Sequence, residues 1–206
     1  MAIDLKDLKK SIDGLGYYYP KEIIKVYGHK ELKIQSAGDY VKNNFLKSIN
    51  KDGYNYLHIE ALIEYIIITT IGLTDVFAII MYKIFNLQPS NREKIYFNDT
   101  LCNKLLKETN YIPNEIANKI KNIRNSKYYQ YLKDLCNYIK HNDVIDTSIS
   151  IKYNREIGGN FDIIIKEFTF NNNKYPSKSF NELYNDYIKI SNDLIEIFKI
   201  FINNYK

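Results

Sequence analysis

The sequence contains few of the residues that mark several common protein classes. It has two cysteines, Cys102 and Cys136, three histidines and no tryptophan among its 206 residues. Two cysteines are too few for a disulfide framework and neither belongs to a paired metal motif, so a reducing cytoplasm is the expected compartment. His29 and His58 stand far from His141 and outside ligand spacing, which leaves a metal site without support.

Other familiar signals are missing as well. The first ten residues, MAIDLKDLKK, lack the apolar core of a secretory signal. The Gly158-Gly159 pair lies outside a phosphate-loop pattern, so we expect no bound cofactor. Hydrophobic residues nevertheless make up 45% of the chain. A sequence of this length and composition can bury a substantial core and predicts one folded domain over residues 1–206.

The positive charge of the chain is concentrated in one segment. The whole sequence has a formal net charge of +5. The segment from Lys104 to Lys152 holds nine basic and five acidic residues, so its own net charge is +4. Such a local excess suits binding to a polyanion such as RNA. A solvated, lysine-rich helix surface would give the same pattern without a ligand.

One stretch is apolar enough to raise the question of a membrane span. Residues 57–87 form the most apolar segment, with YIIITTIGLTDVFAIIMYKIF at its middle. Asp75 lies at its centre, where a charge in lipid costs about 3 kcal/mol or more, and Glu64 weakens the span further. The flanks also lack anchoring Lys, Arg and Trp. We therefore predict a central helix that is buried by other helices and does not enter a membrane.

Glu64 and Asp75 are separated by close to three helical turns and therefore share a face of this predicted helix. A buried acid needs a partner. One candidate partner is a cationic cluster around His141. The alternatives are that Asp75 caps or bonds a neighbouring helix, or faces water at a dimer interface.

Helical periodicity covers most of the remaining chain. The pattern of residues 29–50 includes Leu32, Tyr40 and Val41. Shorter helices are predicted over 99–107 and 113–123. A capping box formed by Ser179 and Glu182 begins a long helix that runs towards the C-terminus.

Between these helices the hydrophobic period changes from 3.6 to 2 residues. The alternation around the turn Gly158-Gly159-Asn160 predicts a two-stranded hairpin near 148–170, followed by a loop over 171–176. The expected fold class is therefore all-α: an up-and-down helical bundle with a small two-stranded hairpin and an N-terminal extension over 1–28. Helices this apolar also predict a homodimer that buries the remaining face.

The stretch from Tyr128 to Thr147, YYQYLKDLCNYIKHNDVIDT, concentrates the polar groups that could do chemistry. Lys133, Asn137 and Lys140 follow one another on one helical face, and His141 lies one turn beyond Asn137. The negative end of the helix dipole favours a protonated histidine there. A cationic imidazole beside an ammonium suits an anchor for phosphate or an acid–base group acting on one.

This helix end resembles the HEPN superfamily of small helical bundles. In that family an Arg, often followed by an Asn, is separated from a His by four to six intervening residues, and Asn137 and His141 match the Asn and the His. The tail from Asn137 to His141 is similar to an N-x-x-K-H branch that continues with a hairpin and a final helix. Cys136 stands where the family has its Arg.

The resemblance implies a metal-independent endoribonuclease with a degenerate motif. His141 would move the proton of an attacking 2′-hydroxyl, while Lys140 would supply part of the charge that the missing Arg gives to the phosphate. We therefore take His141, Asn137 and Lys140 as candidate catalytic residues. Asp75, Glu64 and Lys133 are candidate supporting residues.

The alternative function is a non-enzymatic dimeric module in a defence or toxin–antitoxin-like system. Such a module would bind a nucleotide, or a protein such as an antitoxin or a nucleotidyltransferase. Individual residues also have structural explanations. His141 can bond carbonyl groups at the helix end, Asn137 can fix a neighbouring helix, and Cys136 can be a small core residue.

Overall fold

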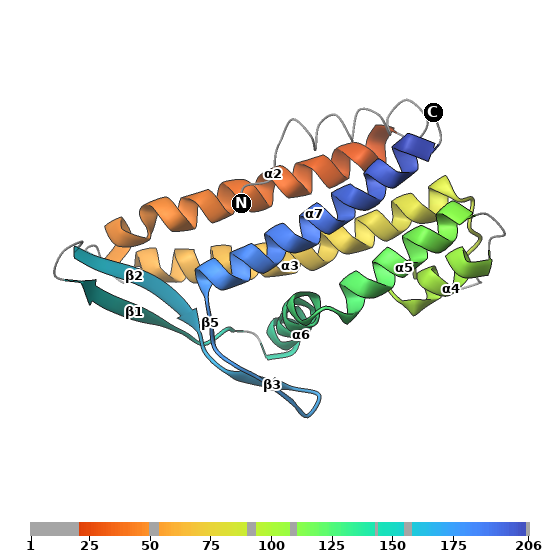
Figure 1. Cartoon of the computed structure of the whole chain (residues 1–206). Coiled ribbons are helices and arrows are strands. Elements are labelled where there is room, and N and C mark those ends of the chain that lie inside the picture. Colours follow the sequence, from red (N-terminus) through yellow and green to blue (C-terminus); the bar gives the residue numbers. More distant parts are fainter. Residues whose placement is uncertain are drawn as a thin grey trace.

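The computed structural model describes residues 21–49, 54–89, 94–107, 111–142, 144–154 and 158–204. Within these ranges the chain is mostly helical with a small amount of antiparallel sheet, as Figure 1 shows. The helices in chain order are α2 (Lys21–Ile49), α3 (Tyr54–Ile84), α4 (Asp99–Lys107), α5 (Tyr111–Asn125), α6 (Lys127–Asn142) and α7 (Phe180–Asn204). The strands are β1 (Thr147–Asn154), β2 (Gly158–Ile165), β3 (Phe168–Phe170), β4 (Asn173–Tyr175) and β5 (Lys178–Ser179).

Three long helices form the main body. In Figure 1, α2, α3 and α7 lie alongside one another, whereas α6 is seen nearly end-on and crosses them. Ile63, Ile67 and Phe77 of α3 are fully buried and belong to the same hydrophobic cluster as Leu194 and Phe198 of α7. The rings of Phe77 and Phe198 lie 5.0 Å apart. Each such side chain stabilises the fold by about 1.5–3 kcal/mol. The stretch Leu57–Ile84 is long and apolar enough to cross a membrane, and 61% of its most apolar window is buried.

The beginning of α2 differs from the sequence prediction. The helix starts at Lys21, so residues 21–28 belong to the bundle and not to an extension; residues 1–20 lie outside the described ranges. Tyr27, Ile34 and Val41 form its buried stripe at seven-residue spacing, whereas Leu32 and Tyr40 are exposed. Single apolar side chains are common on helix surfaces, so Leu32 and Tyr40 did not indicate the buried face of the helix.

The sheet is larger than the predicted two-stranded hairpin. β1 and β2 pair antiparallel as expected, but the predicted turn Gly158-Gly159-Asn160 is wrong, because these residues lie in β2 and pair with the end of β1. β5 adds a third strand beside β2. The predicted loop over 171–176 is wrong, because β3 and β4 form a second hairpin there. Asn171 and Asn172 turn this hairpin with positive φ angles of 49° and 65°. Asparagine tolerates that left-handed conformation better than most residues, and two such residues suit a tight hairpin turn.

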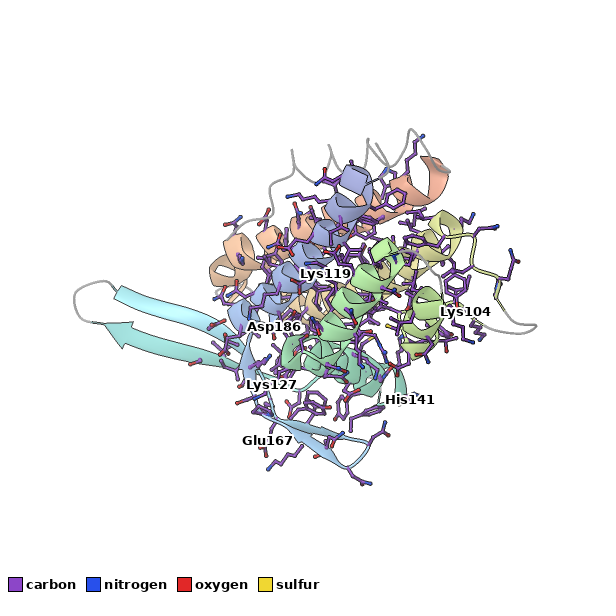
Figure 2. All side chains as sticks on the ribbon, turned by 45° about the vertical axis from the view of Figure 1, so that its right-hand side comes forward. Lys104, Lys119, Lys127, His141, Glu167 and Asp186 are labelled. Atoms are coloured by element: carbon purple, nitrogen blue, oxygen red, sulfur yellow. The ribbon has the colours of Figure 1, made fainter. Side chains whose placement is uncertain are left out.

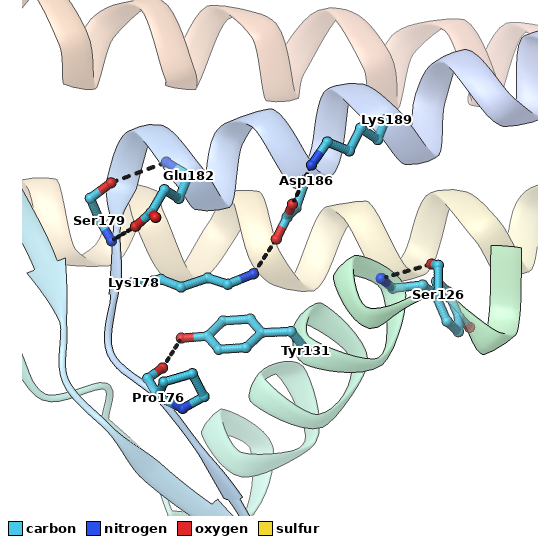
Figure 3. Close-up of polar contacts among 9 residues, drawn as sticks. Ser126, Tyr131, Pro176, Lys178, Ser179, Glu182, Asp186 and Lys189 are labelled. Atoms are coloured by element: carbon cyan, nitrogen blue, oxygen red, sulfur yellow. Dashed lines mark hydrogen bonds and ion pairs between the residues drawn. The ribbon is translucent and has the colours of Figure 1, made fainter.

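The capping box at the start of α7 is confirmed. The Ser179 amide donates to the Glu182 carboxylate at 2.8 Å, and the Glu182 amide donates to the Ser179 hydroxyl at 3.2 Å (Figure 3). These bonds satisfy amide groups that the first turn of a helix leaves free. They also fix the direction of α7 as it leaves β5.

Candidate functional site

The candidate site follows one face of α6. Successive residues of a helix point about 100° apart, which gives α6 three faces. Leu132, Leu135 and Ile139 are buried in the bundle. A second face packs on the β3–β4 hairpin, where the Tyr131 ring lies 5.5 Å from that of Phe168. The third face carries the polar side chains Gln130, Lys133, Asn137 and Lys140.

The N-terminal half of this polar face meets the end of α5. The Gln130 side-chain amide donates to the Arg124 carbonyl. The Arg124 guanidinium in turn binds both carboxylate oxygens of Asp99, with 2.9 Å between Nη2 and Oδ2. Hydrogen bonding to Arg124 lowers the pKa of Asp99, and the charges of Lys121 and Lys133 act in the same direction. Lys133 therefore lies within electrostatic reach of the Arg124–Asp99 pair.

The C-terminal half of the polar face meets α3. Asp75 accepts a hydrogen bond from the Phe97 amide at 3.1 Å. Burial raises the pKa of Asp75, while this hydrogen bond and the through-space charges of Lys140 and Lys30 partly offset the rise. Burial also raises the pKa of the Cys136 thiol, and Lys140 again opposes that change. The structure thus brings Asp75 and Lys140 into one neighbourhood.

His141 does not join this neighbourhood. Its ring is exposed and stacks against Phe170 of the β3–β4 hairpin, with centroids 6.3 Å apart and an interplanar angle of 18°. Because His141 follows Lys140 directly, the two side chains leave α6 about 100° apart, with Asn137 half-buried between their directions. His141 and Lys140 therefore face different surroundings. Figure 2 shows His141 at the lower right of the view, below Lys104.

Glu64 has a different role from Asp75. It accepts a hydrogen bond from the Ile145 amide at 3.1 Å, and Glu60 accepts one from the Thr147 hydroxyl. Both acids lie on α3, and both hold the connection that follows α6. Glu64 thus positions the end of α6 and does not contact the group formed by Asp75 and Lys140.

We call the basic side of α6 the polar seam. It consists of six residues from four helices: Asp75, Asp99, Arg124, Lys133, Asn137 and Lys140. The polar seam contains three cations and two carboxylates. The side chains of Lys140 and Asp99 are exposed, and the other four are at least partly covered. The seam can bind an anion through its ammonium and guanidinium groups. In the described residues no group of three or more His, Cys, Asp or Glu side chains could hold a metal ion.

A cavity of about 190 Å³ lies elsewhere, between α5, α7 and the start of α6. Lys119 pairs there with Glu196 at 3.2 Å, and Tyr128 donates to Asp193. Burial and the Asp193 hydrogen bond raise the pKa of Tyr128 to about 12. None of the residues predicted from the sequence lines this cavity. Its charged side chains and the Tyr128 hydroxyl already pair with one another.

Two further clusters of polar groups were missed by the sequence analysis. Asp186 is 7% exposed and binds the ammonium groups of Lys178 and Lys189, which ties β5 to α7 (Figure 3). Glu31 is fully buried and accepts hydrogen bonds from the hydroxyls of Tyr187 and Ser191. Lys189 lies three residues after Asp186 and could have indicated that cluster. No signal in the sequence marks Glu31 as buried.

Comparison of the chain with family models, curated proteins and solved structures finds no match to any of them.

Proposed function

We propose that this protein is an RNA-directed helical bundle of the HEPN kind, which binds the phosphate backbone of RNA along the polar seam. The observation that carries the proposal is that Lys133 and Lys140 share one face of α6, and that Lys133 and Arg124 both act on Asp99 at one end of that face. These cations come from α5 and α6, inside the segment that holds most of the net charge. Contacts from lysine and arginine to phosphates supply most of the sequence-independent affinity for nucleic acids.

Cleavage of the bound RNA is a second part of the proposal and depends on His141. An exposed imidazole can reach a substrate hydroxyl without rearrangement of the core. Its separation from Lys140 means that one phosphate would have to lie across Asn137 to meet both groups. The geometry therefore supports binding more directly than it supports catalysis.

The test of binding uses a labelled single-stranded oligoribonucleotide and fluorescence anisotropy. The double variant Lys133→Gln/Lys140→Gln should weaken binding about tenfold and reduce the salt slope of log K by about two. The matched control is Lys166→Gln/Lys174→Gln, which removes the same charge from exposed ion pairs near the strands. Equal losses in the two double variants would reject the seam as the binding surface.

The test of cleavage compares the wild type with His141→Ala on tRNA and mRNA, followed by gel electrophoresis. Loss of cleavage in the variant alone would support the catalytic part. Identical inertness of both proteins would remove it and leave the binding proposal standing.

A further feature favours a homodimer as the functional form. Leu57, Tyr65 and Ile68 form an exposed apolar line on α3, and Leu57 is 64% exposed. Val144 is 62% exposed, and the next residue, Ile145, is hydrogen-bonded to Glu64 on the same helix. One face of a single helix can meet its own copy across a twofold axis. Light scattering should detect a dimer that Ile68→Glu converts to a monomer; a monomeric wild type would contradict this.

A further inference from the structure

The pair formed by Arg124 and Asp99 joins a covered cation to an open carboxylate. The Arg124 side chain is 15% exposed, whereas that of Asp99 is 76% exposed. The Gln130 bond to the Arg124 carbonyl anchors the end of α5, so the guanidinium is presented from a fixed helix end. A guanidinium fork binds phosphate with the same paired geometry as a carboxylate. A phosphate could therefore take the place of Asp99 from the solvent side.

The surroundings of Asp99 would favour that exchange. Lys121 lies one turn before Arg124 on α5, and Lys133 approaches from α6; both lower the pKa of Asp99 through their charges. Asp99 is also the first residue of α4, whose N-terminus adds partial positive charge. Once Asp99 moves aside, an incoming anion would meet a guanidinium, two ammonium groups and the start of a helix.

We propose that Arg124, Lys121 and Lys133 form a phosphate-binding subsite that the Asp99 carboxylate occupies in the free protein. The ligand is one phosphodiester group of an RNA strand, and in this respect the inference rests on the proposed function. Pyrophosphate offers the same chemistry without the strand and serves as an independent probe. Asp99 thus acts as an internal competitor that holds the fork of Arg124 until a phosphate displaces it.

The main experiment compares Asp99→Asn with Asp146→Asn. Each variant removes the charge of one exposed carboxylate that forms an ion pair, but Asp146 pairs with Lys166 near the strands. Asp99→Asn should raise affinity for the oligoribonucleotide about fivefold to tenfold and increase the salt slope by about one, because one more phosphate is then neutralised. Asp146→Asn should change affinity by less than about twofold.

A second set of variants shows whether the gain depends on Arg124. In the Asp99→Asn background, Arg124→Lys keeps the positive charge but lacks the fork, and should remove most of the gain. Arg124→Gln should remove all of it. Thermal unfolding followed by circular dichroism identifies any variant that is not folded, and Arg124→Lys is the milder replacement if Arg124→Gln fails.

The outcomes separate the subsite from the proposed function. If the wild type binds RNA but Asp99→Asn and Asp146→Asn behave alike, the subsite is rejected and the RNA proposal stands. If no protein binds RNA, calorimetry with pyrophosphate decides. Binding to Asp99→Asn that disappears with Arg124→Gln would support the subsite and reject RNA as its ligand, whereas no binding of pyrophosphate would reject the subsite as well.

Discussion

Glu31 on α2 and Asp75 on α3 are both acids in the middle of a long helix, but their surroundings differ. Glu31 is fully buried, and its partners are the hydroxyls of Tyr187, Ser191 and, at 3.5 Å, Tyr27. Asp75 is half-buried and accepts a hydrogen bond from the Phe97 backbone amide. The lysines that act on it through their charges, Lys140 and Lys30, belong to two other helices. One acid is surrounded by neutral donors inside the core, and the other lies where cations meet the surface.

This difference separates an acid enclosed in the core from an acid that lies beside accessible cations. Hydroxyl donors satisfy the oxygens of Glu31 without bringing a charge into the core, and burial raises its pKa despite those hydrogen bonds. Nothing at Glu31 is open to a ligand. The lysines near Asp75 are at least partly exposed to solvent, so their ammonium groups can also bind an anion. A buried acid therefore indicates function only when its partners are themselves accessible.

The largest expected effect is the loss of stability when Glu31 is removed. Glu31→Ala should lower the free energy of unfolding by about 3 kcal/mol or more, because it leaves a cavity and three buried hydroxyls without an acceptor. Asp75→Ala should cost about 1 kcal/mol, since only one amide at a half-buried position loses its partner. Urea denaturation measures both values, and equal losses would show that the two sites do not differ in this way.

The burial of Glu31 should also make the stability of the protein depend on pH. Because the folded-state pKa of Glu31 is raised, its contribution to stability is complete below its ordinary pKa of 4.5 and is lost as the pH rises through the raised value. Relative to Glu31→Gln, the wild type should therefore lose stability above about pH 4.5, by at most about 1.4 kcal/mol per pH unit. Urea denaturation at several pH values tests the sign; a relative gain in that range would contradict it.

Removal of one hydroxyl donor should have a smaller effect. Tyr187→Phe should cost about 1.5–2 kcal/mol, since the Glu31 oxygen then loses a buried donor. Tyr128→Phe is the matched control, because Tyr128 also donates to a carboxylate, that of Asp193, but at a half-buried position. Its cost should stay below about 1 kcal/mol. Thermal melting of the two variants side by side gives the comparison.

The smallest expected effect concerns binding at Asp75. Asp75→Asn keeps an oxygen for the Phe97 amide but removes the charge that attracts Lys140 and Lys30. Affinity for RNA should rise about twofold while stability stays nearly unchanged. Fluorescence anisotropy measures the affinity. A fall in affinity would instead make the Asp75 carboxylate part of the binding surface.

Helical periodicity predicted the helices well because it depends on residues close in sequence. Periodicity predicted the short helix α4 over Asp99–Lys107 and the apolar core helix. A local sequence motif predicted the capping box of Ser179 and Glu182. The turn at Asn171 and Asn172 was missed, although the run of three asparagines, Asn171 to Asn173, between Phe170 and Tyr175 is a recognisable hairpin signal. Sequence also could not place β5 beside β2, because that pairing depends on the path of the intervening hairpin.

The candidate site was predicted in its parts but not in its arrangement. The sequence analysis offered a cationic cluster around His141 as the partner of Asp75, but only Lys140 of that cluster acts on Asp75 through its charge, and the hydrogen bond comes from the Phe97 amide. The direction of His141 depends on the β3–β4 hairpin, which supplies Phe170 and was not predicted. Arg124 lies too far upstream of Asn137 and His141 to fit the spacing of the family motif. Only the packing of α5 against α6 brings Arg124 near Lys133.

Glu64 and Asp75 of α3 also fix the distance between two segments that pack against this helix. Asp75 holds the segment that leads into α4, and Glu64 holds the segment that leaves α6. Their separation along α3 corresponds to about 16 Å of helix. One residue inserted between them would swing one carboxylate about 100° around the axis and release one of those segments. The spacing of Glu64 and Asp75 therefore fixes the distance between the segment before α4 and the segment after α6.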